Sequence, residues 1–317
     1  MVELGSIGIF STALEQLPVK QCQAVASEVE QLGYGALWIP ETTADALITA
    51  TVALAATDRM AVATGITSMW TRDALTANGV QHLMATLFGG RFLFGLGVSH
   101  AFLVEGLRGL TYKNPLAGLA SYLDGMDESL PNAMFATRVA QLGLAEALAT
   151  AATAAVPARQ PRIIAALGPR MMQLARVKAD GALAYLQTPE HTRLSREILG
   201  PDRTLAITQM VVMDSDPSVA RAAARRVLNL YLTLPNFVKH FRTLGFSDSD
   251  FTDDGSDGLV DALFAWGGVD QAQQRVADQL AAGANHVNIQ VVTSNWPTDT
   301  PLQHWRDLAG VLSGLSV

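Results

Sequence analysis

Ser99 and His100 close the apolar stretch GRFLFGLGVSH, residues 90–100, and their side chains could do chemistry. An imidazole has an ordinary pKa of about 6.5, so it can accept or release a proton near neutral pH. Glu41 ends a second apolar run, ALWIPE, and offers a carboxylate for the same task. Both runs have the composition of buried strands, so the pattern predicts a site assembled at strand ends.

The turn GPRMM follows another apolar run, PRIIAALG, at residues 161–168. Gly168 permits a tight turn, and Pro169 suits the first position of a helix. The free N–H groups of Arg170 and Met171 would then face outward at the positive end of the helix dipole, where phosphates bind. We interpret the turn as a phosphate-binding site or, equally, as an ordinary helix start.

Two enzyme motifs overlap the first stretch without matching it. GLGVSH begins like the dinucleotide motif GxGxxG, but its sixth position is His100. GVSHA resembles the GxSxG turn of serine hydrolases, with Ala101 in place of the last glycine. Gly106 and Gly109 interrupt the long helix that either motif needs. A dinucleotide fold and a serine hydrolase are therefore disfavoured.

Composition excludes several other classes. The net charge of −7 argues against a nucleic-acid surface, and the single cysteine, Cys22, excludes a disulfide framework. The histidines show neither HxxxH nor HExxH spacing, so we expect no metal site. The acidic segment 246–258 lacks the glycine and glutamate of a calcium loop and is expected to be a solvated loop. With no signal peptide and no apolar run of about 20 residues, we expect a soluble cytoplasmic protein that does not enter membranes.

The candidate residues need a scaffold that brings strand ends together. Eight near-continuous apolar runs alternate with helical segments, as in parallel strands covered on both faces. We predict a single domain, residues 1–317, with a (β/α)8 barrel fold and inserted helices, one of them in the Ala-rich stretch 137–155; a doubly wound open sheet is the alternative. The runs span residues 6–10, 36–41, 60–66, 92–98, 161–168, 181–187, 204–214 and 286–292.

Several stretches together resemble the luciferase-like monooxygenase superfamily, and within it the actinobacterial branch that uses the deazaflavin coenzyme F420. The resemblance covers nearly the whole chain in the right order. It implies a barrel with insertions, often dimeric, that binds flavin or deazaflavin at the mouth formed by the carboxyl ends of the strands. We therefore expect a homodimer acting on a small organic molecule. The stretches are ALWIPE, ATGITSMWTRDA, GRFLFGLGVSH, AALGPRMMQLA with ADGAL, and AGANHVNIQVV.

The resemblance also implies roles for individual residues. The third strand should end in a bulge with a non-prolyl cis peptide bond between Gly65 and Ile66, behind the flavin ring. Ser99 and His100 should contact the polar edge of the ring, and Glu41 should face its reactive centre. The family's phosphate site corresponds here to Leu167, Gly168, Pro169, Arg170 and Met171.

The chain also departs from its relatives. Some deazaflavin-dependent dehydrogenases have Asp-His where this chain has Glu41 and Thr42. Sugar-phosphate dehydrogenases of the family hold the substrate phosphate with lysines, and no lysine lies at a strand end here. A sugar-phosphate substrate is therefore disfavoured.

Three functions remain open from the sequence. The first is an F420-dependent oxidoreductase that transfers hydride, with His100 as general acid or base or as a hydrogen-bond donor to the cofactor, and Glu41 as the weaker candidate. The second is an FMN-dependent monooxygenase that uses oxygen, and the third is a non-catalytic flavin-binding relative. Trp70 and Tyr112 are expected to line the substrate pocket or, equally, to serve only core or rim packing.

Overall fold

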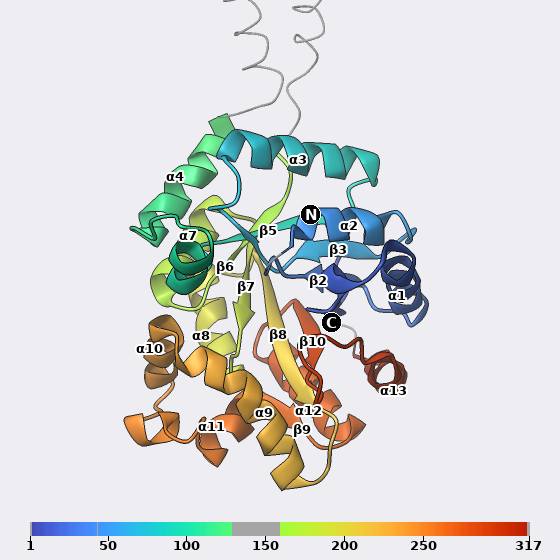
Figure 1. Ribbon diagram of the computed structural model, residues 1–317, viewed down its shortest axis with the longest axis vertical. Coiled ribbons are helices and arrows are strands. Elements are labelled where there is room, and N and C mark those ends of the chain that lie inside the picture. Colours follow the sequence, from blue (N-terminus) through green and yellow to red (C-terminus); the bar gives the residue numbers. More distant parts are fainter. Residues whose placement is uncertain (1, 43, 129–158, 316–317) are drawn as a thin grey trace, which may run out of the picture.

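The computed structural model describes residues 2–42, 44–128 and 159–315. Its core is a closed barrel of parallel strands surrounded by helices (Figure 1). The Ala-rich stretch 137–155, predicted to be helical, lies outside the described residues.

Eight of the strands close the barrel, because β8 pairs with β10 as well as with β7. Every pairing is parallel, so the carboxyl ends of all eight strands lie at one rim. The predicted (β/α)8 barrel is confirmed, and each apolar run supplies one barrel strand. These strands are β1 (Ile7–Phe10), β2 (Ala36–Ile39), β3 (Ala61–Thr64), β5 (Phe92–Gly97), β6 (Arg162–Ala165), β7 (Gly181–Tyr185), β8 (Thr204–Val212) and β10 (His286–Val291).

Helices cover the outer face of the barrel, and polar side chains cap several of them. Asp45 caps α2, where its carboxylate accepts the N–H of Leu47 at 2.9 Å. The helices are α1 (Val19–Gln31), α2 (Ala46–Leu54), α3 (Ala74–Leu87), α4 (Pro115–Glu128), α7 (Pro169–Lys178), α8 (Pro189–Leu199), α9 (Pro217–Leu232), α10 (Pro235–Thr243), α11 (Asp257–Leu263), α12 (Val269–Ala281) and α13 (Leu302–Leu312).

The long connection from β8 to β10 holds most of the additional elements. Helices α9, α10 and α11 lie together beside the barrel (Figure 1), and the short strand β9 (Phe264–Trp266), which was not predicted, pairs with β8. The acidic segment in this connection is largely exposed to solvent, as expected from the sequence, and contains the short turn Asp248–Phe251. Its carboxylates form ion pairs, Asp248 with Arg242 at 2.6 Å and Asp257 with Arg221 at 2.8 Å.

The end of the barrel opposite the rim is filled by side chains. Val2 and Leu4 pack there with Trp38, and His286 completes the layer at 1% exposure. The Nε1–H of Trp38 donates to Nε2 of His286 at 2.9 Å, and the Nδ1 of His286 lies 2.8 Å from the carbonyl of Gly5. This pattern requires the neutral tautomer with the proton on Nδ1, and burial lowers the pKa of His286 to about 4.

We predict that the thermal unfolding midpoint falls as pH is lowered from about 6.5 to about 4. Over this range the unfolded chain binds a proton at His286 that the folded chain does not, so stability present above pH 6.5 is lost. His286→Gln keeps a donor and an acceptor without titrating, and should give a shallower fall. Melting curves of both proteins at several pH values make the comparison, and equal slopes would contradict this account.

Candidate active site

A bulge follows β3 at the rim of the barrel. The peptide bond between Gly65 and Ile66 is cis, as the family resemblance implies, and the short strand β4 (Thr67–Ser68) continues from it to pair with β5. The carbonyl of Ile66 accepts the N–H of Glu41 at 3.2 Å. The bulge is therefore fixed between the ends of β2 and β5.

Two glycines of β5 make room for this bulge. A Cβ on Gly95 would lie 1.8 Å from the carbonyl oxygen of Thr64, and one on Gly97 would lie 2.7 Å from the side chain of Ile66. The hydroxyl of Thr64 reinforces the contact, donating to the carbonyl of Gly95 at 2.7 Å. The Gly-x-Gly pattern that resembles a dinucleotide motif thus serves close packing of the bulge against β5.

Ser99 and His100 follow β5 at the rim. Ser99 has a φ of +55°, a left-handed conformation that is uncommon outside glycine and often marks a functional site. The ring of His100 lies against the rings of Phe102 and Phe237, with centroid distances of 6.2 and 6.0 Å. Burial lowers the pKa of His100, so the imidazole is neutral at pH 7. Its ring nitrogens have no hydrogen-bond partner among the described residues.

The chain then folds back onto the rim through residues 99–112, here named the mouth segment. A π-helical turn, Phe102–Leu107, starts it, and Tyr112 ends it with its hydroxyl 3.4 Å from the carbonyl of Ser99. The rings of Tyr112 and Trp70 lie 5.8 Å apart, and Trp70 donates its indole N–H to the carbonyl of Val98 at 2.9 Å. The structure therefore brings the two predicted pocket residues together with Ser99.

Glu41 lies at the end of β2 with its side chain only 2% exposed. Its Oε2 is 3.2 Å from Nη1 of Arg72, and its Oε1 is 3.7 Å from Nη2 of Arg108 in the mouth segment. Burial raises the pKa of Glu41, while Arg72 acts to lower it. The carboxylate is thus engaged by two arginines and makes no described contact with His100.

The turn after β6 forms the start of α7, as predicted. Gly168 precedes the helix with no side-chain cap, Pro169 is its first residue, and the side chain of Arg170 is exposed. A Cβ on Gly168 would meet no atom within 4 Å, and its φ of −92° does not require glycine. Neither packing nor backbone conformation explains glycine here, so the free space favours the approach of a ligand. Leu167 and Met171 are half-buried beside the turn.

The structure adds four residues that the sequence did not single out as a group. The hydroxyl of Tyr185, at the end of β7, donates to Oε1 of Gln290 at 2.6 Å. The ring of Tyr185 lies 5.3 Å from that of Tyr231, which lies 4.8 Å from that of Phe237. Tyr185 and Gln290 lie in strands that the sequence predicts. Each is a polar residue in an otherwise apolar run, and this feature could have identified them from the sequence. Tyr231 and Phe237 come from the inserted helices, whose position no local pattern indicates.

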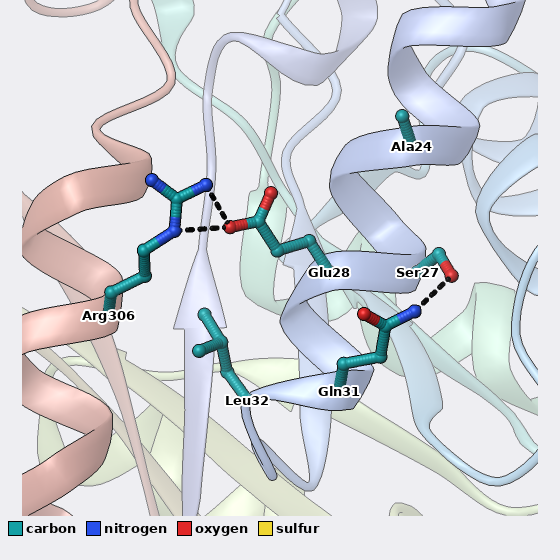
Figure 2. Close-up of a pocket in the computed structure, with 6 residues that line it drawn as sticks. All are labelled: Ala24, Ser27, Glu28, Gln31, Leu32 and Arg306. Carbon is teal, nitrogen blue, oxygen red and sulfur yellow. Dashed lines mark hydrogen bonds and ion pairs between the residues drawn. The ribbon is translucent and has the colours of Figure 1, made fainter.

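A surface pocket lies away from the rim, between α1 and α13 (Figure 2). An ion pair crosses it, with Nε of Arg306 at 2.7 Å from Oε1 of Glu28. None of the predicted site residues contributes to it. Its lining residues are Ala24, Ser27, Glu28, Gln31, Leu32 and Arg306.

Other kinds of site find no support in the described part of the chain. No group of three or more His, Cys, Asp or Glu side chains there could hold a metal ion. None of the described helices combines the length and apolar composition needed to cross a membrane.

The closed parallel barrel places this protein in the class of (β/α)8-barrel proteins. In such barrels the ligand site lies at the carboxyl ends of the strands. The Gly65–Ile66 bulge, His100 and the start of α7 all lie at that rim here. A model of the luciferase-like monooxygenase family matches residues 7–286. The chain therefore belongs to the luciferase-like monooxygenase family.

Individual relatives agree with this assignment. A Mycobacterium tuberculosis protein that bears the name coenzyme F420-dependent oxidoreductase is 26% identical over 303 residues, covering 81% of this chain and 84% of that protein. The fold resembles a coenzyme F420-dependent tetrahydromethanopterin reductase from Methanopyrus kandleri, with a TM-score of 0.71, 17% identity and coverage of 97% and 98% of the two chains. It also resembles the oxygenating constituent of 3,6-diketocamphane monooxygenase from Pseudomonas putida, bound to FMN, with a TM-score of 0.68, 13% identity and coverage of 98% and 97%.

We predict that alanine destabilises the protein strongly at one glycine of the rim and hardly at all at another. Gly95→Ala should lower the free energy of unfolding by about 3 kcal/mol or more, because the new Cβ overlaps the backbone of Thr64. Gly168→Ala should change it by no more than about 0.5 kcal/mol, because the space around Gly168 is open. Urea denaturation measures both. A large loss in Gly168→Ala would mean that the turn needs glycine for folding.

Proposed function

We propose that this protein is an F420-dependent oxidoreductase that transfers hydride between the deazaflavin and a small organic molecule. The observation that carries the proposal is the rim itself, where the Gly65–Ile66 bulge, the neutral His100 and the open Gly168 turn occupy neighbouring strand ends. The name of the Mycobacterium tuberculosis relative supports F420 as the cofactor.

The polar atoms at the rim fit the edge of a flavin-type ring. Ser11, after β1, is 4% exposed with an unpartnered hydroxyl, and Gln187, after β7, is 1% exposed with both amide atoms unpartnered. Buried polar atoms normally have hydrogen-bond partners, so these groups are suited to the carbonyl and N–H groups of a bound ring. The bulge would back the ring, with Ser99 at its polar edge.

The start of α7 fits the phosphate of the same cofactor. The N–H groups of Arg170 and Met171 lie in the first turn of a helix that has no side-chain cap, and the guanidinium of Arg170 adds a positive charge. Open space at Gly168 allows a phosphate to approach the backbone, with Leu167 and Pro169 on either side.

Coenzyme F420, when bound, supplies a two-electron hydride carrier that reacts poorly with oxygen. The chain then has to orient the substrate, exclude water and accept or donate one proton. Because the imidazole of His100 is neutral at pH 7, one of its ring nitrogens can accept the proton released when an alcohol is oxidised. Glu41 is held by Arg72 and Arg108, so its proposed role is to fix the mouth segment beside the ring. Trp70 and Tyr112 would line the substrate side.

An FMN-dependent monooxygenase is the second candidate. The fold shared with the Pseudomonas putida monooxygenase, whose structure is in complex with FMN, favours it. A non-catalytic flavin-binding relative is the third possibility, and a homodimer is the proposed assembly for all three.

We predict that Gly168→Val weakens binding of coenzyme F420 by on the order of tenfold or more, because the side chain blocks the approach of the phosphate. Gly310→Val is a matched control, since Gly310 also has open space but lies in α13. Fluorescence titration of each protein with oxidised F420, and separately with FMN, measures the affinities. Preference of the wild type for FMN would support the monooxygenase, and binding of neither would contradict both.

We predict that His100→Ala lowers the rate of alcohol oxidation by about 100-fold or more with little change in F420 affinity. In the wild type the rate should fall in acid, below the ordinary imidazole pKa, because protonated His100 cannot act as a base. Single-turnover reduction of bound F420 by a panel of short secondary alcohols tests both statements. Loss of F420 binding with an unchanged rate per bound cofactor would instead make His100 a cofactor contact.

A further inference from the structure

Two histidine side chains face each other where α10 packs beside α8 (Figure 1). The ring of His191 in α8 and the ring of His240 in α10 lie edge to face, with their centroids 4.1 Å apart and their planes at 84°. The two residues are 8% and 5% exposed. Nδ1 of His191 and Nε2 of His240 have no hydrogen-bond partner within the described structure. We name these two residues the imidazole pair, and neither takes part in the proposed function.

The arrangement fits two uncharged rings. Two imidazolium ions at this separation would repel each other strongly, because burial keeps water from screening their charges. Burial lowers the pKa of His191 to about 4, and burial together with His191 lowers the pKa of His240 to about 3. In the described part of the chain no carboxylate acts on the pKa of either ring. The pair is therefore neutral at pH 7.

The surroundings of the pair supply no compensating negative charge in the described structure. Residues three or four positions along each helix share the face of the histidine, and all of them are uncharged. Tyr231 of α9 packs on α10, and burial raises its pKa to about 12, so it too is neutral. The residues that share the faces are Leu194 and Ser195 on α8, and Asn236, Phe237, Thr243 and Leu244 on α10.

The charged side chains of the same two helices are exposed. Arg193 of α8 pairs with Glu190 and Glu197, while Arg242 of α10 pairs with Asp248, and Lys239 is exposed. The helix dipoles have opposite effects on the pair. A positive charge is disfavoured in the first turn of α8, where His191 lies, and favoured in the last turn of α10, where His240 lies.

Helix α10 connects the imidazole pair to the rim of the barrel. Phe237 lies three residues before His240, so the two side chains share one face of α10. The ring of Phe237 lies 6.0 Å from that of His100 and 4.8 Å from that of Tyr231. The pair thus anchors the helix that supplies Phe237 to the candidate active site.

Helix α8 has other anchors, whereas α10 has fewer. The hydroxyl of Thr192 in α8 donates to Oε1 of Gln279 in α12 at 2.6 Å, and Thr188 caps α8 by accepting the N–H of His191 at 3.2 Å. Helix α10 has nine residues and no side-chain cap at its start. Loss of the contact between the rings would therefore displace α10 while α8 keeps its place.

We propose that the imidazole pair is a pH-sensitive latch, which holds α10 on α8 and Phe237 against His100 while both rings are neutral, and which releases α10 when the pair is protonated. In the released helix the rings would titrate near the ordinary imidazole pKa of about 6.5, so release takes up protons. The contact is fully present above this pH and is progressively lost as the pH falls toward the lowered pKa values of the pair.

Hydrogen–deuterium exchange of residues 235–243 in the wild type tests the latch. After correction for the intrinsic exchange rate, the equilibrium constant for opening of α10 should rise about tenfold or more for each pH unit below about pH 6, because opening takes up one or two protons. The ring 15N signals of His191 and His240 should report protonation over the same pH range. Protonation of both rings while α10 stays protected, or opening that does not depend on pH, would overturn the proposal.

Variants assign the effect to the pair. The double variant His191→Phe and His240→Phe keeps two aromatic rings that cannot take up a proton, so opening of its α10 should lose the pH dependence. If that protein does not fold, His191→Phe alone should give a weaker dependence than the wild type. His286→Gln is the matched control, because it removes an imidazole that is 1% exposed at the opposite end of the barrel, and its α10 should respond to pH like the wild type. An unchanged response in the histidine-free pair, or its loss in His286→Gln, would contradict the assignment.

Discussion

Closure of the sheet by the pairing of β8 with β10 is the constraint on which the rest of the structure depends. Six consecutive residue pairs, from His286 with Ala206 to Val291 with Val211, join the ends of the sheet. Because all pairings are parallel, closure brings the carboxyl ends of strands far apart in sequence to one rim. The Gly65–Ile66 bulge, Ser99 and the Gly168 turn become neighbours in this way, without a shared motif.

Packing at the rim explains why the β5 sequence has its glycines. The bulge lies so close to β5 that a Cβ at Gly95 or Gly97 would overlap Thr64 or Ile66, whereas a Cβ at Gly168 would meet no atom within 4 Å. The buried carboxylate of Glu41 is compensated by the positive charges of Arg72 and Arg108, which form ion pairs with it. The bulge and Glu41 are therefore both held by neighbouring segments, the bulge by β5 and Glu41 by the arginines.

Most of the barrel could be predicted from sequence, because parallel strands covered on both faces are apolar runs that stand out between helical segments. The bulge at Gly65–Ile66 was predictable only through family resemblance, whereas the turn at Gly168 could be read from local chemistry. The other half of the site was not predictable. Tyr231 and Phe237 lie in α9 and α10, and only tertiary packing of these helices brings them to His100. The contact of Arg108 with Glu41 also joins residues far apart in sequence, so no local pattern indicates it. Strand β9 was not predicted because it is only three residues long.

The filled end of the barrel has a consequence for the order of events in a reaction. Val2, Leu4, Trp38 and His286 close that end in the described structure, with Trp38 fully buried. Two ligands sharing the rim must then use the same entrance. If one ligand lies beneath the other, it has to arrive first and leave last, and the filled end of the barrel would then give the two ligands a fixed order of binding and release.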